Sequence, residues 1–592
     1  MADASKKSRP PVKPSTAKSS KLIAPKPASG KAPVKTAPKA APKPAPKPVA
    51  KPAAKPVAKA APKALAKATP KSTTKAAPAP VSKALPKAAA KPVAKPVTKP
   101  LSTRTAPAGK AAAPVAKPSA KPLVVTVAPR PAKSETVSIR ELKAPAPASL
   151  LLQGATWVTL NMVREVLQGD VRVENGRITA IGERLKPRKD ERVVDVHGLT
   201  AFPGFIQLHV HLCQTLFRHM AEDLALFDWL RNRIWPLEAA HNPASLAASS
   251  RLGILELLLS GTTTVFTMET THHTETVFQE LVAGGQRAFS GKALMDSGRG
   301  VPSELREDTA RSLDMARKHM ADWHGKGRLQ VTLNPRFAPC CSADLLKGVG
   351  SLARESGAWI HTHIAETRDE VQLTREVFGR NPVQLYEALG YLEGKFLGAH
   401  AVHLTEAEKL ILAAHRNAVL THCPSANLKL GSGIAPLSDL LARGIRVGLG
   451  ADGAACNNNL NIIEEMRLAG LLQKVSRGAA TLSAETLLEL ATIDAARAIG
   501  LEEELGSIEP GKLADLTFFD LNHPSIQPAG TPAQQLVWSA SSRDLVHTLV
   551  EGEFLVRDRR ATRLDHDEVV KTARVEARKL VSRAGLEGKV RV

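Results

Sequence analysis

The chain has 592 residues and a net charge of +26. The excess charge lies in one part: residues 1–150 carry 32 basic and 3 acidic residues, whereas the remaining residues carry 50 and 53. Five scattered cysteines exclude a disulfide framework, and the absence of a long apolar run excludes a membrane helix. No secretory signal is recognisable, so we expect a protein of the reducing cytoplasm without membrane association.

Residues 1–147 form a Lys/Ala/Pro-rich segment that holds most of the 43 prolines and lacks Phe, Trp and Tyr. Without large apolar side chains a segment buries too little surface to offset the entropy of ordering, so we expect disorder. The composition is similar to that of linker-histone tails. Such a tail either neutralises phosphates of DNA or RNA without reading sequence, or is a flexible extension without a partner.

Strand patterns follow at both flanks of the remaining chain. Residues 171–182 alternate apolar and polar side chains around Asn175-Gly176, which predicts a hairpin. Further strand-like runs occur at 193–198, 514–520 and 546–556. We therefore expect a composite β-sandwich from residues 148–201 and 508–562, and a C-terminal helix within 563–592.

Between the flanks, short β-rich runs alternate with amphipathic helical stretches such as 242–260, 304–324 and 342–356. The β-rich runs are 202–209, 262–268, 287–295, 328–336, 358–363, 396–401, 418–423 and 445–451. Eight strands with intervening helices predict an α/β fold, a (β/α)₈ TIM barrel over residues 202–507. In this fold the chemistry lies where the strands end.

Ionisable side chains close several of these runs. His209 and His211 are two residues apart on one strand, so they project from the same face. His363 and Asp452 end the fifth and eighth runs. Three imidazoles and one carboxylate at a common barrel mouth match the ligands of a first-row divalent metal with one position left for water.

As a set, these motifs resemble the amidohydrolase superfamily, in the branch of purine and nucleoside deaminases and s-triazine hydrolases. The motifs are PGF at 203–205, HVH at 209–211, HIAET at 363–367, AHAVHL at 399–404, HCPSANLKL at 422–430 and GADGA at 450–454. The resemblance covers residues 150 to 560 and excludes the basic tail.

The resemblance implies a role for each motif residue. His209, His211, His363 and Asp452 match the ligands of one divalent metal ion, for which we expect zinc, although iron fits the same donors. Glu366 matches the general acid/base. His400 matches the residue that polarises the attacking water or the developing oxyanion, and Asp452 is also a candidate proton relay. No lysine ends the fourth run, where two-metal members carry a bridging carbamate.

The substrate contacts point in two directions. Trp229 and Glu238 resemble the deaminases of 5′-deoxyadenosine, methylthioadenosine and adenosylhomocysteine, in which a glutamate binds the ribose hydroxyls. The alternative for Glu238 is a helix salt bridge with Arg231 or Arg233. Gln214, Arg336 and Phe337 resemble guanine deaminases, in which the equivalent residues bind the purine ring. His403 has either a substrate-side or a structural role. These substrate-side candidates are Gln214, Trp229, Glu238, Arg336, Phe337 and His403.

We therefore expect a hydrolase of carbon–nitrogen bonds in cyclic amidines that releases ammonia from an aminated purine nucleoside. A guanine deaminase and an s-triazine amino- or chlorohydrolase remain alternatives. A nucleic-acid-associated protein whose main functional part is the basic tail is an alternative of another class. The partners we expect are a small amino-heterocycle and, as in many members of this family, further copies of the same chain.

Overall fold

The computed structural model describes residues 149–590. The disorder and the nucleic-acid binding predicted for residues 1–147 therefore lie outside the described residues. Within 149–590, every helix is too short or too polar to cross a membrane.

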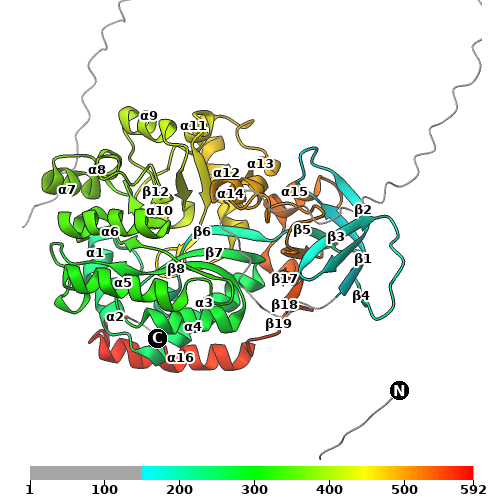
Figure 1. Ribbon diagram of the computed structural model, residues 1–592, viewed down its shortest axis with the longest axis horizontal. Helices are drawn as coiled ribbons and strands as arrows, with labels where there is room; N and C mark the ends of the chain where they lie inside the picture. The colour runs from blue at the N-terminus through cyan, green and yellow to red at the C-terminus, as the bar shows by residue number, and fades with distance from the viewer. Residues whose placement is uncertain (1–148, 591–592) are drawn as a thin grey trace, which may run out of the picture. The chain divides into compact units, whose positions relative to one another are not determined.

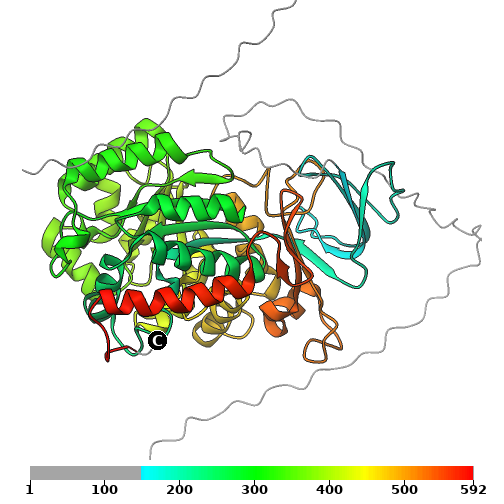
Figure 2. The ribbon, with the colours of Figure 1, turned by 90° about the horizontal axis from the view of Figure 1, so that it is seen from below.

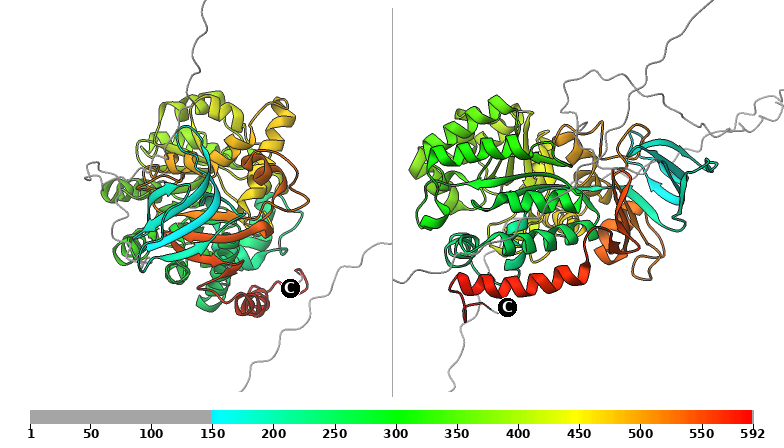
Figure 3. Two further views of the ribbon diagram at one scale, coloured as in Figure 1. Left: turned by 90° about the vertical axis from the view of Figure 1, so that its right-hand side faces the viewer. Right: turned by 60° about the horizontal axis from the view of Figure 1, so that its bottom comes forward.

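Both flanking segments contribute strands to one nine-stranded sheet, in which strands far apart in sequence lie side by side (cyan and orange in Figure 1). The strands are β1 (Ser149–Val158), β2 (Val166–Glu174), β3 (Arg177–Gly182), β4 (Arg192–Asp195), β5 (Thr200–Pro203), β16 (Leu516–Phe519), β17 (Leu545–Val550), β18 (Glu553–Arg557) and β19 (Arg560–Ala561). Antiparallel pairing of β5 with β16 joins the two segments. This sheet faces the viewer in the left-hand view of Figure 3.

The predicted hairpin is confirmed, because Glu174 pairs with Arg177 across the two-residue turn Asn175-Gly176. Trp157 of β1 packs edge-on against Phe518 of β16, with ring centroids 5.6 Å apart, so the buried core of the sheet draws on both flanks. The hydrogen bonds join these strands in one sheet, and the two-layer sandwich expected from the sequence stays a prediction.

Parallel strands form the central part of the structure. They are β6 (Phe205–His211), β7 (Thr262–Glu269), β8 (Arg287–Leu294), β9 (Leu329–Val331), β10 (Asn334–Pro335), β11 (Ile360–Ile364), β12 (Phe396–His400), β13 (Ala418–His422), β14 (Arg446–Leu449) and β15 (Asp452–Gly453). Several of them, including β6, β7 and β8, are buried along their whole length, as expected for parallel strands covered by helices.

The parallel pairings run in chain order and return to the first strand. A bridge between Leu333 and Ile360 links the strands β6–β10 to β11–β14. Asp452, three residues after β14, pairs with Val210 of β6. This connectivity is that of a TIM-barrel-type α/β fold, in agreement with the α/β class that the sequence predicts.

Helices follow most of these strands and cover them on the outside (Figure 3, right). The helices are α1 (Leu226–Trp229), α2 (Trp235–Ala239), α3 (Pro243–Leu259), α4 (Thr274–Gly284), α5 (Thr309–Trp323), α6 (Ala343–Ser356), α7 (Arg368–Phe378), α8 (Pro382–Ala388), α9 (Glu406–Ala414), α10 (Pro424–Lys429), α11 (Leu437–Ala442), α12 (Ile462–Arg477), α13 (Ala484–Leu490), α14 (Ile493–Ala498), α15 (Pro532–Gln534) and α16 (His566–Arg583). Shorter 3₁₀ or π turns are η2 (Leu212–Phe217), η3 (Leu230–Ile234), η4 (Ser303–Leu305), η5 (Ala338–Cys340), η6 (Gln535–Ser539) and η7 (Ser542–Asp544).

The helix ends follow from local sequence signals. Asn242 caps α3 by accepting the backbone N–H of Ser245, and Pro243 occupies its first turn. The helix that the sequence predicts over 563–592 is shorter, because α16 ends at Arg583. It packs along α3 and appears in red in Figure 2.

One predicted strand is two strands. The run at 202–209 divides at Gly204 into β5, which belongs to the nine-stranded sheet, and β6, which begins the barrel. A Cβ atom at position 204 would lie 2.3 Å from Oγ1 of Thr263, so only glycine fits where the chain passes from one sheet to the other.

A buried charge cluster joins the barrel to the flanking sheet. Arg287 of β8 forms ion pairs with Asp515 and with Glu551, the latter at 2.6 Å. The side chains of Arg287 and Asp515 are 1% and 3% exposed. A buried charge that loses its partner costs far more free energy than a surface charge does.

We therefore expect Asp515→Asn, which keeps the shape and removes the charge, to lower the free energy of unfolding by roughly 3 kcal/mol. Urea titration followed by tryptophan fluorescence measures the change. The matched control is Asp314→Asn, since Asp314 pairs with Arg317 at the surface at 3.1 Å, and that variant should lose at most about 1 kcal/mol. Similar losses in both variants would contradict a structural role for the buried cluster.

Candidate metal centre and substrate cavity

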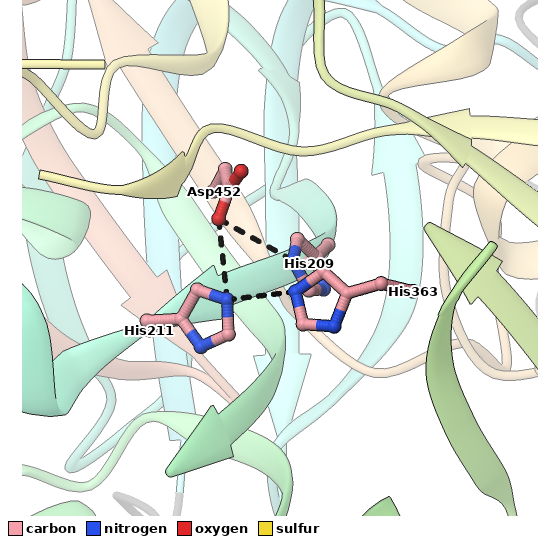
Figure 4. A group of neighbouring side chains, drawn as sticks. All are labelled: His209, His211, His363 and Asp452. Atoms are coloured by element: carbon pink, nitrogen blue, oxygen red, sulfur yellow. Dashed lines mark hydrogen bonds and ion pairs between the residues drawn. The ribbon is translucent and has the colours of Figure 1, made fainter. Parts of the chain in front are cut away.

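Four predicted side chains converge at the ends of the barrel strands. His209 and His211 come from β6, His363 from β11 and Asp452 from β15 (Figure 4). One donor atom from each lies within 4.8 Å of the others. The Nε2 atom of His211 is 3.2 Å from Nε2 of His363 and 3.2 Å from Oδ1 of Asp452, and Nε2 of His209 is 3.4 Å from the same oxygen.

The outer nitrogens of the three imidazoles are held by hydrogen bonds. Nδ1 of His211 lies 2.7 Å from the carbonyl oxygen of Met268, and Nδ1 of His363 lies 2.6 Å from that of Arg336. Because a carbonyl only accepts, both rings donate from Nδ1, and in the neutral form each keeps an Nε2 lone pair within the group of four donors. Nδ1 of His209 lies 2.7 Å from Nε2 of His361.

The residues present fit a metal ion. Nε2 of His209 is buried and makes no hydrogen bond within the described residues, although a buried nitrogen of this kind normally has a partner. Burial lowers the pKa of His209 to about 4, which keeps the imidazole neutral. Burial acts to raise the pKa of Asp452, but the neighbouring imidazoles of His209 and His211 hold it well below its ordinary value. Neutral imidazole and ionised carboxylate are the metal-binding forms.

The backbone at this site adopts uncommon conformations. Asp452 has φ of 61° and His400 has φ of 80°, in the left-handed region that non-glycine residues rarely occupy. Gly450 allows the chain before Asp452 to approach β6, because a Cβ atom there would lie 2.7 Å from the carbonyl oxygen of His209. The close approach brings the carboxylate of Asp452 to the histidines.

The predicted acid/base pair lies beside the four donors. Oε2 of Glu366 is 3.8 Å from Nε2 of His400, and that nitrogen is 3.7 Å from Oδ2 of Asp452. Ser432 donates to Oε1 of Glu366 at 3.2 Å. Burial raises the pKa of Glu366 above 4.5. For His400, burial acts to lower the pKa, but the charges of Glu366 and Asp452 raise it above 6.5.

A cavity opens onto these groups. Its polar wall includes His211, His363, Glu366, His400 and Asp452. The apolar wall consists of large side chains from three parts of the chain, namely Leu226, Trp229, Leu230, Phe337 and Leu430. A flat, largely apolar ring with a few polar atoms is the kind of ligand that such a cavity binds.

Three of the predicted substrate contacts bind one another. The carboxylate of Glu238 accepts hydrogen bonds from Nε2 of Gln214 at 3.0 Å and from Nη1 of Arg336 at 2.6 Å. Gln214 and Arg336 line the cavity, but Glu238 does not, and its side chain is fully buried. The partner of Glu238 is therefore Arg336, and the alternative pairing with Arg231 or Arg233 is wrong.

Of the remaining substrate candidates, Trp229 and Phe337 face the cavity and His403 does not. Trp229 and Phe337 line the cavity. Nε2 of His403 lies 2.7 Å from the carbonyl oxygen of Ser432, and His403 is absent from the cavity wall. His403 therefore contacts the backbone of Ser432, the residue whose hydroxyl bonds Glu366. This contact favours the structural role for His403.

Two residues of the site were missed in the sequence. His361 is completely buried beneath His209. Glu370 lines the cavity and accepts the backbone N–H groups of Ala365 at 3.0 Å and of Glu366 at 2.5 Å. Burial, and next the charge of Glu366, raise the pKa of Glu370 to about 7. The sequence signal for His361 was its H-x-H spacing with His363. The signal for Glu370 was its position four residues after Glu366.

Several named proteins are similar to this chain in sequence. A chain from Pelotomaculum thermopropionicum, named 5-methylthioadenosine/S-adenosylhomocysteine deaminase, is 37% identical over 443 residues, which are 74% of this chain and all of that one. A 5′-deoxyadenosine deaminase from Methanobrevibacter smithii is 36% identical over 69% of this chain and 93% of its own length.

Among solved structures, a zinc-bound adenosine deaminase from Xanthomonas campestris superposes with a TM-score of 0.69 at 30% identity, covering 74% of this chain and all of that one. The guanine deaminase of E. coli gives 0.62 at 25% identity and covers 69% and 98%. The model of the amidohydrolase family matches residues 200–555. By this match, which includes all four converging donors, the chain belongs to the amidohydrolase family.

Proposed function

We propose that the protein is a metal-dependent deaminase that hydrolyses the exocyclic amino group of a purine nucleoside of the 5′-deoxyadenosine, methylthioadenosine or adenosylhomocysteine type. The observation that carries the proposal is the convergence of His209, His211, His363 and Asp452 beside Glu366 at one cavity. Relatives with deaminase names, 36–37% identical over most of their length, support the substrate class.

The four donors would hold one divalent ion, for which zinc is our choice because a related solved structure contains it. When bound, such an ion acts as a Lewis acid and lowers the pKa of water toward neutrality. The remaining chemistry belongs to the side chains around the cavity.

In the proposed reaction the oxygen of water adds to the ring carbon that bears the amino group. Glu366, ionised, accepts a proton from the water and delivers it to the ring nitrogen. Nδ1 of His400 is 2.8 Å from Oδ1 of Asn427, so it donates there, and protonated Nε2 faces the space between Glu366 and Asp452. That N–H stabilises charge on the attacking oxygen.

The added hydroxyl then gives its proton to the amino group, with Asp452 as the candidate relay. The carbon–nitrogen bond breaks, ammonia leaves and the ring keeps a carbonyl.

A purine base such as guanine is the second candidate substrate. One observation favours it: the side chain of Glu238 is fully buried, bonds Gln214 and Arg336 and does not line the cavity, so it presents no oxygen to a ribose in this arrangement. Arg336 and Gln214, rather than Glu238, face the cavity, and their remaining polar atoms suit the edge of a ring. A nucleoside would have to displace Arg336 from Glu238.

Three further expectations rest on the sequence rather than on this site. We infer a (β/α)₈ barrel over 202–507 as the catalytic domain, with 148–201 and 508–562 as its companion. Self-association and a cytoplasmic location follow from the resemblance and composition, and they stay predictions. If the basic segment 1–147 is a phosphate-neutralising tail rather than an extension without a partner, it adds electrostatic attraction for nucleic acids.

Removing a ligand should remove the metal. We expect Asp452→Asn to reduce the metal content, measured by plasma mass spectrometry after dialysis, from about one equivalent per chain to less than about a tenth. His272→Asn is the control, since His272 is an exposed histidine whose ring bonds the carbonyl of Glu304. Full metal content in Asp452→Asn would contradict the assigned ligand set.

Glu366→Gln should retain the metal and fold but lose roughly 10²–10⁴-fold in kcat/KM, because glutamine cannot accept and return a proton. The control is Glu376→Gln on α7, the helix that follows Glu366, since Glu376 is exposed and bonds only Gln372 among the described residues. Ammonia release from purine nucleosides is the readout. Turnover by Glu366→Gln at the level of the control would mean that another group carries the proton.

The pH dependence should follow Glu366. Its carboxyl must be ionised to accept a proton, and burial raises its pKa above 4.5. We therefore expect kcat/KM to fall as the pH drops through an apparent pKa above 4.5, while metal content stays constant. An acid limb at or below pH 4.5 in unaltered protein would show that the limiting ionisation belongs to a group without this burial.

Glu238→Gln separates the two substrate candidates. If Glu238 binds ribose hydroxyls after release by Arg336, kcat/KM should fall about tenfold or more for nucleosides relative to the corresponding free bases. A steady-state panel of adenosine-type nucleosides, adenine and guanine measures this ratio. Equal losses for nucleosides and bases would favour the purine-base candidate.

A further inference from the structure

His361 lies behind the predicted metal site, on the same strand as His363. They are two positions apart, so both side chains leave one face of β11. His361 is fully buried, and its Nε2 atom is 2.7 Å from Nδ1 of His209. It is not one of the four converging donors, because its Nε2 atom faces His209 and not the cavity.

The three histidine ligands differ in how their outer nitrogens are held. Those of His211 and His363 bond backbone carbonyl oxygens, of Met268 and Arg336, which no side-chain substitution removes. The outer nitrogen of His209 alone bonds a side chain. A single substitution at position 361 can therefore change the surroundings of one ligand and leave the other two intact.

The hydrogen bond between the two rings couples their proton positions, because one nitrogen must donate and the other must accept. His209 can offer the Nε2 lone pair to a metal only when its proton is on Nδ1. Nδ1–H must then donate to Nε2 of His361, so His361 must be the tautomer with its proton on Nδ1. In the opposite arrangement His361 donates, the proton of His209 moves to Nε2, and the lone pair needed by the metal is lost.

We propose that His361 is a positioning residue that accepts the Nδ1–H of His209 and thereby holds this ligand in the tautomer and orientation that bind the metal. The inference rests on the proposed function, because it assumes that His209 is a ligand. It adds a residue outside the ligand set that sets metal affinity without touching substrate.

The packing around His361 supports a fixed acceptor. Its ring stands edge-on to that of Phe266, with centroids 6.2 Å apart and planes at 83°. Phe266 in turn stacks on Phe289 at 4.2 Å. The ring of His361 also stands edge-on to that of His209, at 4.9 Å. A buried ring wedged between aromatic neighbours keeps one orientation, so the acceptor is in place before a metal binds.

The test measures the zinc affinity of the full chain by competition with a chelating dye after metal removal, at one fixed pH. His361→Leu removes the acceptor, and we expect the dissociation constant for zinc to rise about 10–100-fold. His361→Gln places an amide oxygen near the position of Nε2 and should stay within about threefold of the unaltered chain. His361→Asn is too short to reach His209 and should behave like the leucine variant, which provides a second test if leucine prevents folding.

His319→Leu is the matched control. His319 is also a buried imidazole edge-on to a phenylalanine, Phe278 at 5.3 Å, but its Nε2 pairs with Glu275 at 2.9 Å, away from the four donors. It should lose stability in thermal unfolding without a change in zinc affinity.

Each outcome decides a different point. Unchanged zinc affinity in His361→Leu or in His361→Asn would overturn the proposal. Equal losses in the leucine and glutamine variants would also overturn it, because the volume of the ring and not its acceptor would then matter. Zinc binding without ammonia release from any purine would contradict the proposed function but leave the role of His361 standing. Absence of zinc binding by the unaltered chain would overturn both.

Discussion

Closure of the strand ring is the constraint on which the site depends. The hydrogen-bonded pairing of Asp452 with Val210 joins the end of the barrel to its beginning. It places a carboxylate from β15 between the two histidines of β6, more than 240 residues earlier in the chain. Gly450 permits this approach, and the left-handed conformation of Asp452 turns its side chain inward. Without the closure, three imidazoles would face one another without an anionic donor.

Burial determines the chemistry of the groups that meet there. Burial lowers the pKa of His209 and of His363 and keeps both imidazoles neutral, whereas it raises the pKa of Glu366. His400 is the exception, since two carboxylates near its Nε2 atom outweigh burial. Neutral imidazoles, a carboxyl with a raised pKa and an imidazole with a raised pKa thus lie within one small volume, each set by what surrounds it.

The substrate end of the cavity is organised by a different interaction, the buried pair of Glu238 and Arg336. The pair connects α2, which follows the apolar wall formed by Trp229, with the segment after β10. It neutralises both charges and leaves Gln214 and Arg336 as the polar groups at the cavity wall. The nucleoside and purine-base candidates differ in whether this pair opens.

The residues alone were sufficient for the coarse α/β fold class and for choosing four side chains that converge, because strand-end histidines and the periodicity of buried strands are local patterns. They were not sufficient for contacts between distant segments. The partner of Glu238 proved to be Arg336, 98 residues away, rather than a neighbour on its own helix. The run at 202–209 divided between two sheets at Gly204, where a Cβ atom would lie 2.3 Å from Oγ1 of Thr263. His361 gained its role only from the ring of His209 above it. Such contacts depend on how strands and loops come together in space, which no spacing along the chain specifies.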